Sequence, residues 1–178
     1  KLAIVQTVDN PVIDAYVRLK QRYGADILVE VEPHKVEQAE LLATIQQLND
    51  DPSVHGIIVQ LPLADESATD EAVNAVAPSK DVDGLGEQAQ RDPATPMAIN
   101  WLAAGYNITL AGKKIAIVGR GRLVGAPLAR MWQASGYDVT VLDRSHADKL
   151  DQLIKYDVVV TAVGVPSLIV SKYLKIGA

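Results

Sequence analysis

The sequence predicts an α/β protein with two lobes, each built on a parallel sheet. Short apolar runs of strand length alternate with amphipathic runs of helical length, and this order is typical of parallel sheets. Nearly half of the residues are hydrophobic, which is enough for a sizeable core. Between the two halves, residues 78–96 hold three prolines and two glycines among few apolar side chains. That composition indicates a connector that lines a cleft between the lobes.

We therefore expect an N-terminal lobe of residues 1–97 and a C-terminal lobe of residues 98–178. The chain begins inside an apolar strand and stops at Gly177-Ala178 without a closing strand or helix. The sequence thus predicts a fold that is incomplete at both ends.

The elements of the N-terminal lobe follow from apolar spacing and from cap and breaker residues. Asn10 and Pro11 provide a cap and a first-turn proline for the first helix, and Gly24 is expected to end it. Pro33 is expected to break the chain after the second strand. The expected strands span residues 2–8, 27–31 and 56–60, and the expected helices span about 11–23, 36–49 and 69–76.

The elements of the C-terminal lobe begin with a bridging helix and then alternate. The order from residue 114 is strand, glycine turn, helix, strand, helix and strand, which is half of a doubly wound fold. The expected strands span residues 114–118, 139–142 and 157–161, and the expected helices include 98–106 and 123–135.

A glycine-rich turn joins the first strand of this half to the helix that follows it. Gly119, Gly121 and Gly125 have the spacing G-x-G-x-x-x-G, one residue longer than the usual dinucleotide fingerprint. Such a turn points backbone N–H groups at an anion, and the helix dipole favours its charge. We predict a Rossmann-type lobe that binds a dinucleotide. The alternative is a turn that serves only close packing of helix against strand.

The choice between NADP and NAD depends on two residues at the end of the next strand. Asp143 is an acid where many such proteins read the 2′-hydroxyl of the ribose, which favours NAD. Arg144, together with Arg120 of the glycine turn, favours the 2′-phosphate, because a guanidinium binds phosphate bidentately. We expect NADP, with NAD possible.

Charge and composition exclude several function classes. The net charge of −5 argues against nucleic-acid binding, which needs basic patches. The chain has no cysteine, and its three histidines are scattered without ligand spacing, so no metal is expected. No apolar run reaches the length of a membrane span, and no signal peptide is visible. We expect a cytoplasmic protein that does not engage a membrane.

Several polar side chains of the first half stand at positions that suit a ligand site. Tyr16 and Lys20 are four residues apart, so both project from one face of a helix. Gln60 ends a strand, and the carboxyl ends of parallel strands face the ligand crevice. Asp81 and Asp83 lie in the polar connector. Taken singly, each has a structural explanation as a solvated helix face, a strand tip or a turn.

The order of these segments resembles the bifunctional methylenetetrahydrofolate dehydrogenase/cyclohydrolase family, over nearly the whole chain. The segments that carry the resemblance are Tyr16-x-x-x-Lys20, Gly56-Ile57-Ile58-Val59-Gln60-Leu61-Pro62-Leu63, Pro78-Ser79-Lys80-Asp81-Val82-Asp83-Gly84, Pro93-Ala94-Thr95-Pro96 and Gly119-Arg120-Gly121-x-x-Val124-Gly125-x-Pro127. The resemblance implies NADP-dependent oxidation of 5,10-methylenetetrahydrofolate to 5,10-methenyltetrahydrofolate and hydrolysis of the product to 10-formyltetrahydrofolate. It also implies one-carbon metabolism, a link to purine biosynthesis, and a homodimer.

The resemblance implies a role for each polar residue of the first half. Lys20 is expected to be the acid/base group of the hydrolysis, and Tyr16 to stack on the aminobenzoyl ring. Gln60 is expected to hold Lys20, since an uncharged partner suits a proton-transferring lysine better than a glutamate, which would retain its proton. Asp83 is expected to hold the polar edge of the pterin. The residues expected at the cofactor are Thr95, Gly119, Arg120, Gly121, Val124, Gly125, Asp143 and Arg144.

Departures from the family pattern leave two alternatives open. Gly121 stands where the family usually has serine and Ala94 where it usually has cysteine, while Ile13 and Ala98 replace a serine and a glycine. The loop after Gly84 is short, and the family's Pro-Gly-Gly run is absent. The alternatives are an NAD(P)-dependent dehydrogenase acting on another small substrate, such as the shikimate type, and a non-catalytic dinucleotide-binding module.

Overall fold

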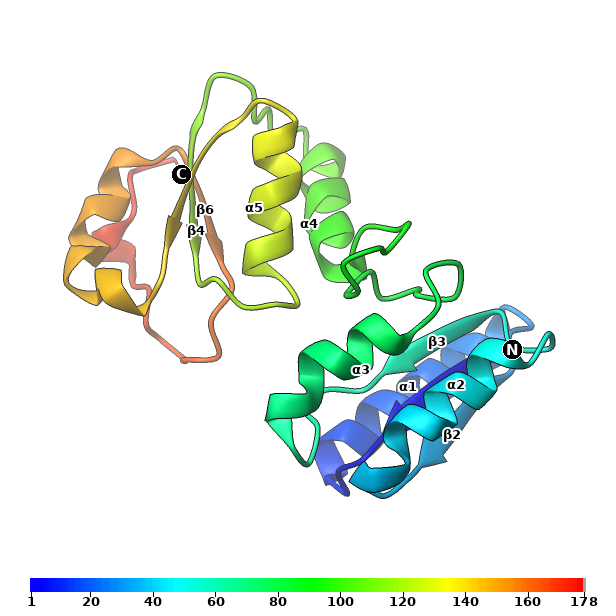
Figure 1. The fold of residues 1–178 in the computed structure, drawn as a ribbon. Coiled ribbons are helices and arrows are strands. Elements are labelled where there is room, and N and C mark those ends of the chain that lie inside the picture. Colours follow the sequence, from blue (N-terminus) through cyan, green and yellow to red (C-terminus); the bar gives the residue numbers. More distant parts are fainter. Residues whose placement is uncertain (178) are drawn as a thin grey trace. The chain divides into compact units, whose positions relative to one another are not determined.

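The computed structural model describes residues 1–177, except for the side chains of residues 144 and 146–149. The chain forms two compact units, Lys1–Arg91 and Asp92–Ala178 (Figure 1). The division falls after Arg91, so the helix α4 (Ala94–Gly105) lies wholly in the second unit. The sequence-based boundary at residue 97 would cut this helix in its first turn.

The first unit is a parallel sheet covered by helices on both faces. Its strands β1 (Leu2–Gln6), β2 (Val31–Lys35) and β3 (Gly56–Val59) lie in the order β2-β1-β3. Helix α1 (Pro11–Asp26) packs Ile13 and Val17 against one face. Helices α2 (Leu41–Asp50) and α3 (Thr69–Ala75) pack against the other (Figure 1). The predicted α/β class and parallel pairing are confirmed.

Helix α1 begins as predicted but does not end as predicted. The side-chain oxygen of Asn10 accepts a hydrogen bond from the Val12 N–H at 2.8 Å, and Pro11 is the first helical residue. Gly24 is buried inside the helix rather than capping it. A Cβ atom there would lie 2.6 Å from the Val29 carbonyl oxygen. The glycine therefore permits close packing of the helix on the chain that follows it.

Strand β2 is the clearest correction to the sequence analysis. Of the predicted strand over residues 27–31, only Val31 lies in β2; residues 27–30 form a turn and an irregular segment that follow α1, with Leu28 in the left-handed region. The observed strand contains Pro33, which was expected to break the chain. Proline is tolerated because β2 lies at the edge of the sheet and pairs only with β1.

The lysine of the connector caps helix α2. The Nζ atom of Lys80 donates to the backbone oxygens of Leu48, Asn49 and Asp51 at 2.9, 2.7 and 2.7 Å. The last carbonyls of a helix have no partner within it, and a cation there also interacts favourably with the helix dipole. Lys80 thereby fixes the start of the connector to helix α2 of the first unit.

Lys80→Met should destabilise the first unit by about 2 kcal/mol, because hydrogen bonds to a charged donor are lost while the carbonyls regain only part of their bonding from water. The expected fall in melting temperature is about 8–16 °C for a unit of this size, measured by calorimetry. Lys155→Met, at an exposed position of the second unit, removes the same charge and is the matched control. Equal melting temperatures for both variants would contradict the capping role.

The second unit repeats the layered plan of the first. Its strands β4 (Lys114–Val118), β5 (Asp138–Leu142) and β6 (Val158–Thr161) are parallel, in the order β5-β4-β6. Helices α4 and α5 (Gly125–Ala134) cover one face, and the Trp132 Nε1–H donates to Asn100 Oδ1 at 3.2 Å to join them. A 3-10 segment over Arg144–Lys155 takes the place of the helix expected before the last strand (Figure 1).

Candidate active site and cofactor site

The first site is organised around a lysine and a glutamine. Lys20 lies on α1 and Gln60 directly after β3, and both side chains are half-buried. The Lys20 Nζ donates to Gln60 Oε1 at 2.9 Å. The Gln60 Nε2 in turn donates to the Leu61 carbonyl at 3.0 Å. This second bond fixes which end of the amide faces the lysine, so Lys20 meets an acceptor.

A carboxyl group from the connector completes this cluster. The connector is fastened to β3, because the Ile57 N–H donates to the Lys80 carbonyl at 2.8 Å. The buried Asp81 then shapes the loop by accepting from the N–H groups of Gly84 and Gly86 at 2.8 and 2.9 Å. Asp83 takes no part in these two hydrogen bonds, and it is half-buried.

The environment of Asp83 favours its neutral form. Burial away from water raises the pKa of the Asp83 carboxyl above its ordinary value of 3.8. The positive charge of Lys20 lowers this pKa, and the negative charge of Asp81 raises it further. An amine, a neutral amide and a carboxyl with a raised pKa thus share one neighbourhood. Together these three side chains can bind and transfer protons, which is the chemistry that the family resemblance implies for this site.

Asp83→Asn should raise the melting temperature at pH 7 by about 1–3 °C. Folding raises the pKa of Asp83, so the folded state holds the Asp83 proton more strongly than the unfolded state. The contribution of Asp83 to stability is therefore present at low pH and is lost as the pH rises through the pKa of the folded state. The gain should therefore shrink towards pH 4. Melting curves between pH 4 and 8 test this, with Asp92→Asn as an exposed control. A gain that grew as pH fell would refute it.

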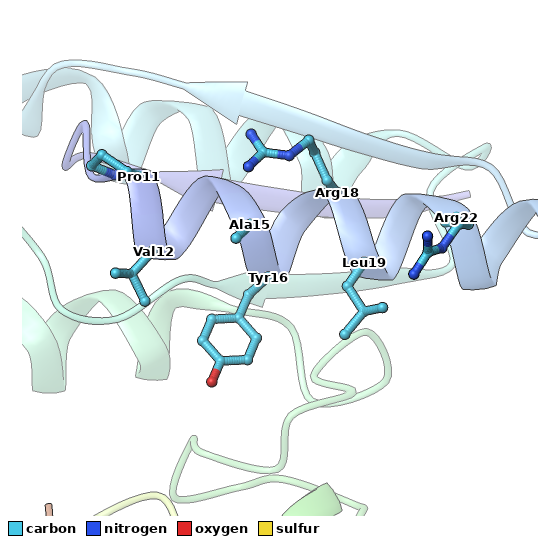
Figure 2. A pocket seen from close by; sticks show the side chains of 7 residues that line it. All are labelled: Pro11, Val12, Ala15, Tyr16, Arg18, Leu19 and Arg22. Atoms are coloured by element: carbon cyan, nitrogen blue, oxygen red, sulfur yellow. The ribbon is translucent and has the colours of Figure 1, made fainter.

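Tyr16 lies one helical turn before Lys20, on a more exposed face. Its side chain has an exposed fraction of 59 %, and it lines a hollow on the outer face of α1 (Figure 2). The structure therefore places Lys20, Gln60 and Asp83 in one cluster, with Tyr16 beside it. The roles of these four residues stay predictions.

The second site is the glycine turn between β4 and α5. Gly119 has a φ of 111°, and a Cβ atom there would collide with the Ala162 carbonyl. A Cβ atom on Gly125 would collide with the Gly119 carbonyl. Nothing lies within 4 Å of the Cβ position of Gly121. The outer two glycines thus allow close packing, and the middle one leaves its backbone open to a ligand.

A cavity of about 780 Å³ opens beside this turn, where β4, β5 and β6 end. The helix α5 begins next to it without a side-chain cap. In its first turn the Ala126 N–H donates to the Gly121 carbonyl at 3.1 Å and Pro127 has no N–H, so the Gly125 N–H is the first-turn donor that could face an anion. The residues that line the cavity are Val118, Gly119, Arg120, Gly121, Leu142, Asp143, Ser145, Leu150, Ala162, Val163, Gly164, Val165 and Leu168. Its position and size suit a dinucleotide.

The other residues predicted at the cofactor are placed differently. Val124 and Gly125 form the start of α5 rather than the cavity wall. Thr95 is exposed in the first turn of α4 and is not among the residues that line the cavity. The side chain of Arg144 lies outside the described part of the structure.

The Asp143 carboxylate accepts hydrogen bonds from within its own turn. Its Oδ1 accepts from the backbone N–H and the hydroxyl of Ser145 at 2.9 and 2.6 Å. Ser145 was not predicted at this site, nor was the segment 163–168 that follows β6. Their position in the sequence could have indicated this. Ser145 and the segment 163–168 each follow a parallel strand, and these strands end at the same edge of the sheet as the glycine turn.

Two further kinds of feature are absent from the described residues. Among them, no group of three or more histidine, aspartate or glutamate side chains is placed to hold a metal ion. Nor does any helix in that part of the chain combine the length and apolarity needed to cross a membrane.

Two family models match the chain, one for each unit. Residues 1–83 match the catalytic domain of tetrahydrofolate dehydrogenase/cyclohydrolase, and residues 93–178 match its NAD(P)-binding domain. The bifunctional protein FolD 2 of Geobacter metallireducens is 35 % identical over 190 residues, covering 99 % of this chain and 67 % of the relative. The bifunctional protein FolD of Lacticaseibacillus casei is 39 % identical, with the same coverage. The chain thus spans about two thirds of the length of these relatives.

Solved structures of FolD enzymes also align with nearly the whole chain. The bifunctional FolD of Campylobacter jejuni aligns with a TM-score of 0.91 and 32 % identity, covering 98 % of this chain and 67 % of that one. FolD of Trypanosoma brucei, complexed with NADP and an inhibitor, aligns at 0.86 and 28 %, covering 98 % and 64 %. Shikimate 5-dehydrogenase of Thermus thermophilus shares only the fold, at 0.62 and 17 % over 98 % of this chain and 74 % of that one.

Proposed function

This chain belongs to the tetrahydrofolate dehydrogenase/cyclohydrolase family, and from that premise we propose that its first unit binds a reduced folate and its second unit binds NADP. The proposed reactions are the oxidation of 5,10-methylenetetrahydrofolate to 5,10-methenyltetrahydrofolate and the hydrolysis of that product to 10-formyltetrahydrofolate. The observation that carries the proposal is the 2.9 Å hydrogen bond from Lys20 to Gln60.

The hydrolysis needs a group that accepts and returns a proton. Water adds to the cationic methenyl carbon and loses a proton, and the bond from this carbon to one ring nitrogen then breaks as that nitrogen gains a proton. We assign both transfers to the Nζ of Lys20, held at 2.9 Å from Gln60 Oε1. The uncharged amide orients the amine without holding it permanently protonated, as a carboxylate would.

Two further residues of the first unit are assigned to substrate binding. Asp83, half-buried near Lys20, suits a hydrogen bond to the polar edge of the pterin, because its carboxyl oxygens can accept from N–H groups there. Tyr16 presents an exposed ring one turn from Lys20, and we assign it to stacking against the aminobenzoyl group.

The second unit fits a dinucleotide on the geometry of its glycine turn. Gly121 offers an open backbone, α5 begins without a side-chain cap, and the adjacent cavity measures about 780 Å³. When bound, NADP supplies the acceptor for the hydride that leaves the methylene carbon. We assign Arg120 to the 2′-phosphate. Asp143 already accepts two hydrogen bonds from Ser145, which supports a role in shaping the turn rather than in reading the ribose.

The proposal extends to assembly and cellular role. Trp101, Leu102 and Tyr106 on α4 have exposed fractions of 70, 60 and 74 %, and an exposed apolar face of this kind supports an interface in a homodimer. We place the enzyme in the cytoplasm, in one-carbon metabolism that supplies purine biosynthesis. Sedimentation velocity tests the dimer, and a monomer at all concentrations would contradict it.

The test of the proposed function is a pair of spectrophotometric assays on the chain. One follows reduction of NADP or NAD in the presence of 5,10-methylenetetrahydrofolate, and the other follows the decay of 5,10-methenyltetrahydrofolate. We expect both activities, with faster reduction of NADP. Dinucleotide binding without either reaction would favour a non-catalytic module, and a strong preference for NAD would remove the role assigned to Arg120.

A further inference from the structure

Gln6, the last residue of β1, is a buried amide whose oxygen lacks a partner within the described chain. Its exposed fraction is 2 %. Its Nε2 donates to Asp14 Oδ1 over a long 3.4 Å, but among the residues that the structure describes none donates a hydrogen bond to its Oε1. A buried acceptor without a bond costs free energy, so polar atoms of this kind typically bind an internal water.

The bond to Asp14 fixes which end of the Gln6 amide is the oxygen. Asp14 also forms an ion pair with Lys35 at 3.1 Å. Hydrogen bonds from Lys35 and then from Gln6 hold the pKa of Asp14 below its ordinary value. Asp14 is therefore a carboxylate, which can only accept, so it faces the NH₂ end of the amide. The Gln6 oxygen points away from the Asp14–Lys35 pair.

Gln6 lies beside Gln60 on the face of the sheet that α1 covers. The Gln60 N–H extends the parallel ladder of β1 and β3 by donating to the Val5 carbonyl at 2.8 Å. Gln6 and Gln60 thus occupy neighbouring positions on adjacent strand ends, which are about 4.8 Å apart. The Gln6 side chain bonds to Asp14 of α1. The Gln60 side chain accepts from Lys20 of the same helix, so the two amides share one face.

We propose that Gln6 Oε1 binds a water molecule that also contacts the Nζ of Lys20, and that Gln6 is thereby a positioning residue for the hydrolysis. This anchoring water donates to the Gln6 oxygen and accepts an N–H of Lys20. The Gln60 amide has a second N–H besides the one that bonds Leu61, and it is a further donor to the water. A buried water typically makes about three hydrogen bonds. The inference rests on the proposed function, because it concerns the proton assigned to Lys20.

Two anchors fix the direction of the lysine lone pair. A neutral amine carries two N–H groups and one lone pair, and with Gln60 Oε1 as its single acceptor it can turn about the Cε–Nζ bond. When the second N–H of Lys20 bonds the anchoring water, the lone pair points in the one direction left, towards the substrate. There it accepts the proton of the water that adds to the methenyl carbon. Hydride transfer does not use this lone pair, because the cofactor accepts the hydride.

The test is Gln6→Met, which keeps the length of the side chain and removes its acceptor. We expect kcat for hydrolysis to fall by about ten- to hundredfold, because a misdirected base loses much of its effect. KM and the rate of NADP reduction should stay at their wild-type values. The matched control is Ile4→Val, since Ile4 is fully buried on the same face and packs against Ile13 and Val17. It loosens the packing without removing a polar atom, and it should leave the ratio of the two rates unchanged.

A crystal structure of the wild-type protein tests the water directly. We expect density for a water within about 3.2 Å of both Gln6 Oε1 and Lys20 Nζ. Well-ordered density without a water at that position would overturn the inference, and this result would stand even if the Gln6 variant failed to fold.

The kinetic outcomes separate the inference from the proposed function. Normal hydrolysis by Gln6→Met would overturn the inference. An equal fall in both reactions would overturn it as well, because it would reveal a general effect on the fold of the folate site. In both cases, turnover of both folates by the wild-type protein leaves the proposed function standing. If the wild-type protein catalysed neither reaction, the proposed function would fall, and the inference with it.

Discussion

Replacing Lys20 with methionine should abolish the hydrolysis of 5,10-methenyltetrahydrofolate while the protein stays folded. Methionine keeps the length and apolar stem of lysine but cannot accept or donate the proton, and general acid–base catalysis contributes about 10²- to 10⁴-fold to a rate. Within the described part of the chain, the side-chain hydrogen bond that is lost is the one to Gln60 Oε1, and Gln60 is half-buried and can turn to water. The decay of methenyl absorbance measures the effect directly.

The control for this result is Lys113→Met, which removes an exposed lysine of the second unit. It should hydrolyse the substrate at the wild-type rate. Melting curves of both variants exclude unfolding as the cause of lost activity. Normal hydrolysis by the Lys20 variant would show that the proton passes through another group, and the assignment of the first site would then be wrong.

The second large effect is expected at the glycine turn. Gly125→Ala should destabilise the second unit by about 3 kcal/mol and abolish dinucleotide binding. The added Cβ would collide with the Gly119 carbonyl and lie 3.3 Å from the Arg120 Cα. Because both neighbours are backbone atoms, neither can move without opening the turn, and overpacking of this kind costs about 1–3 kcal/mol or more.

Two other glycines separate packing from ligand binding. Gly105 is the last residue of α4 and has nothing within 4 Å of its Cβ position, so Gly105→Ala should leave stability unchanged or slightly raised. Gly121→Ala should fold normally, because its Cβ position is also open, yet weaken the dinucleotide by intruding where its phosphates approach. Thermal melting and calorimetric titration with NADP measure both properties. Normal stability of Gly125→Ala would contradict the packing argument.

The buried strands were predictable because their signal is local. Residues 56–59 and 114–118 are short apolar runs, and the structure places both in the sheets. Strand β2 was missed because Pro33 is a breaker except at a sheet edge, and edge position is a property of the topology. Gly24 was misassigned because a helix-ending glycine and a close-packing glycine look alike in sequence.

The candidate site was predicted only in part, for a related reason. The positions of Lys20 and Gln60 follow from helical spacing and from the strand end, although their contact depends on tertiary structure. Nothing in the sequence shows that Lys80 caps α2 or that burial raises the pKa of Asp83. Both depend on backbone atoms and solvent access contributed by distant segments.

The bond between the Gln60 amide and the Leu61 carbonyl has a consequence for the proposed catalytic cycle. Because the amide cannot rotate freely, the same oxygen faces the amine whether Lys20 is charged or neutral, and an N–H remains available to it in either form. In the proposed mechanism the lysine can thus give up its proton and regain it while the contact with Gln60 is kept, so no rearrangement of this contact is needed between one turnover and the next.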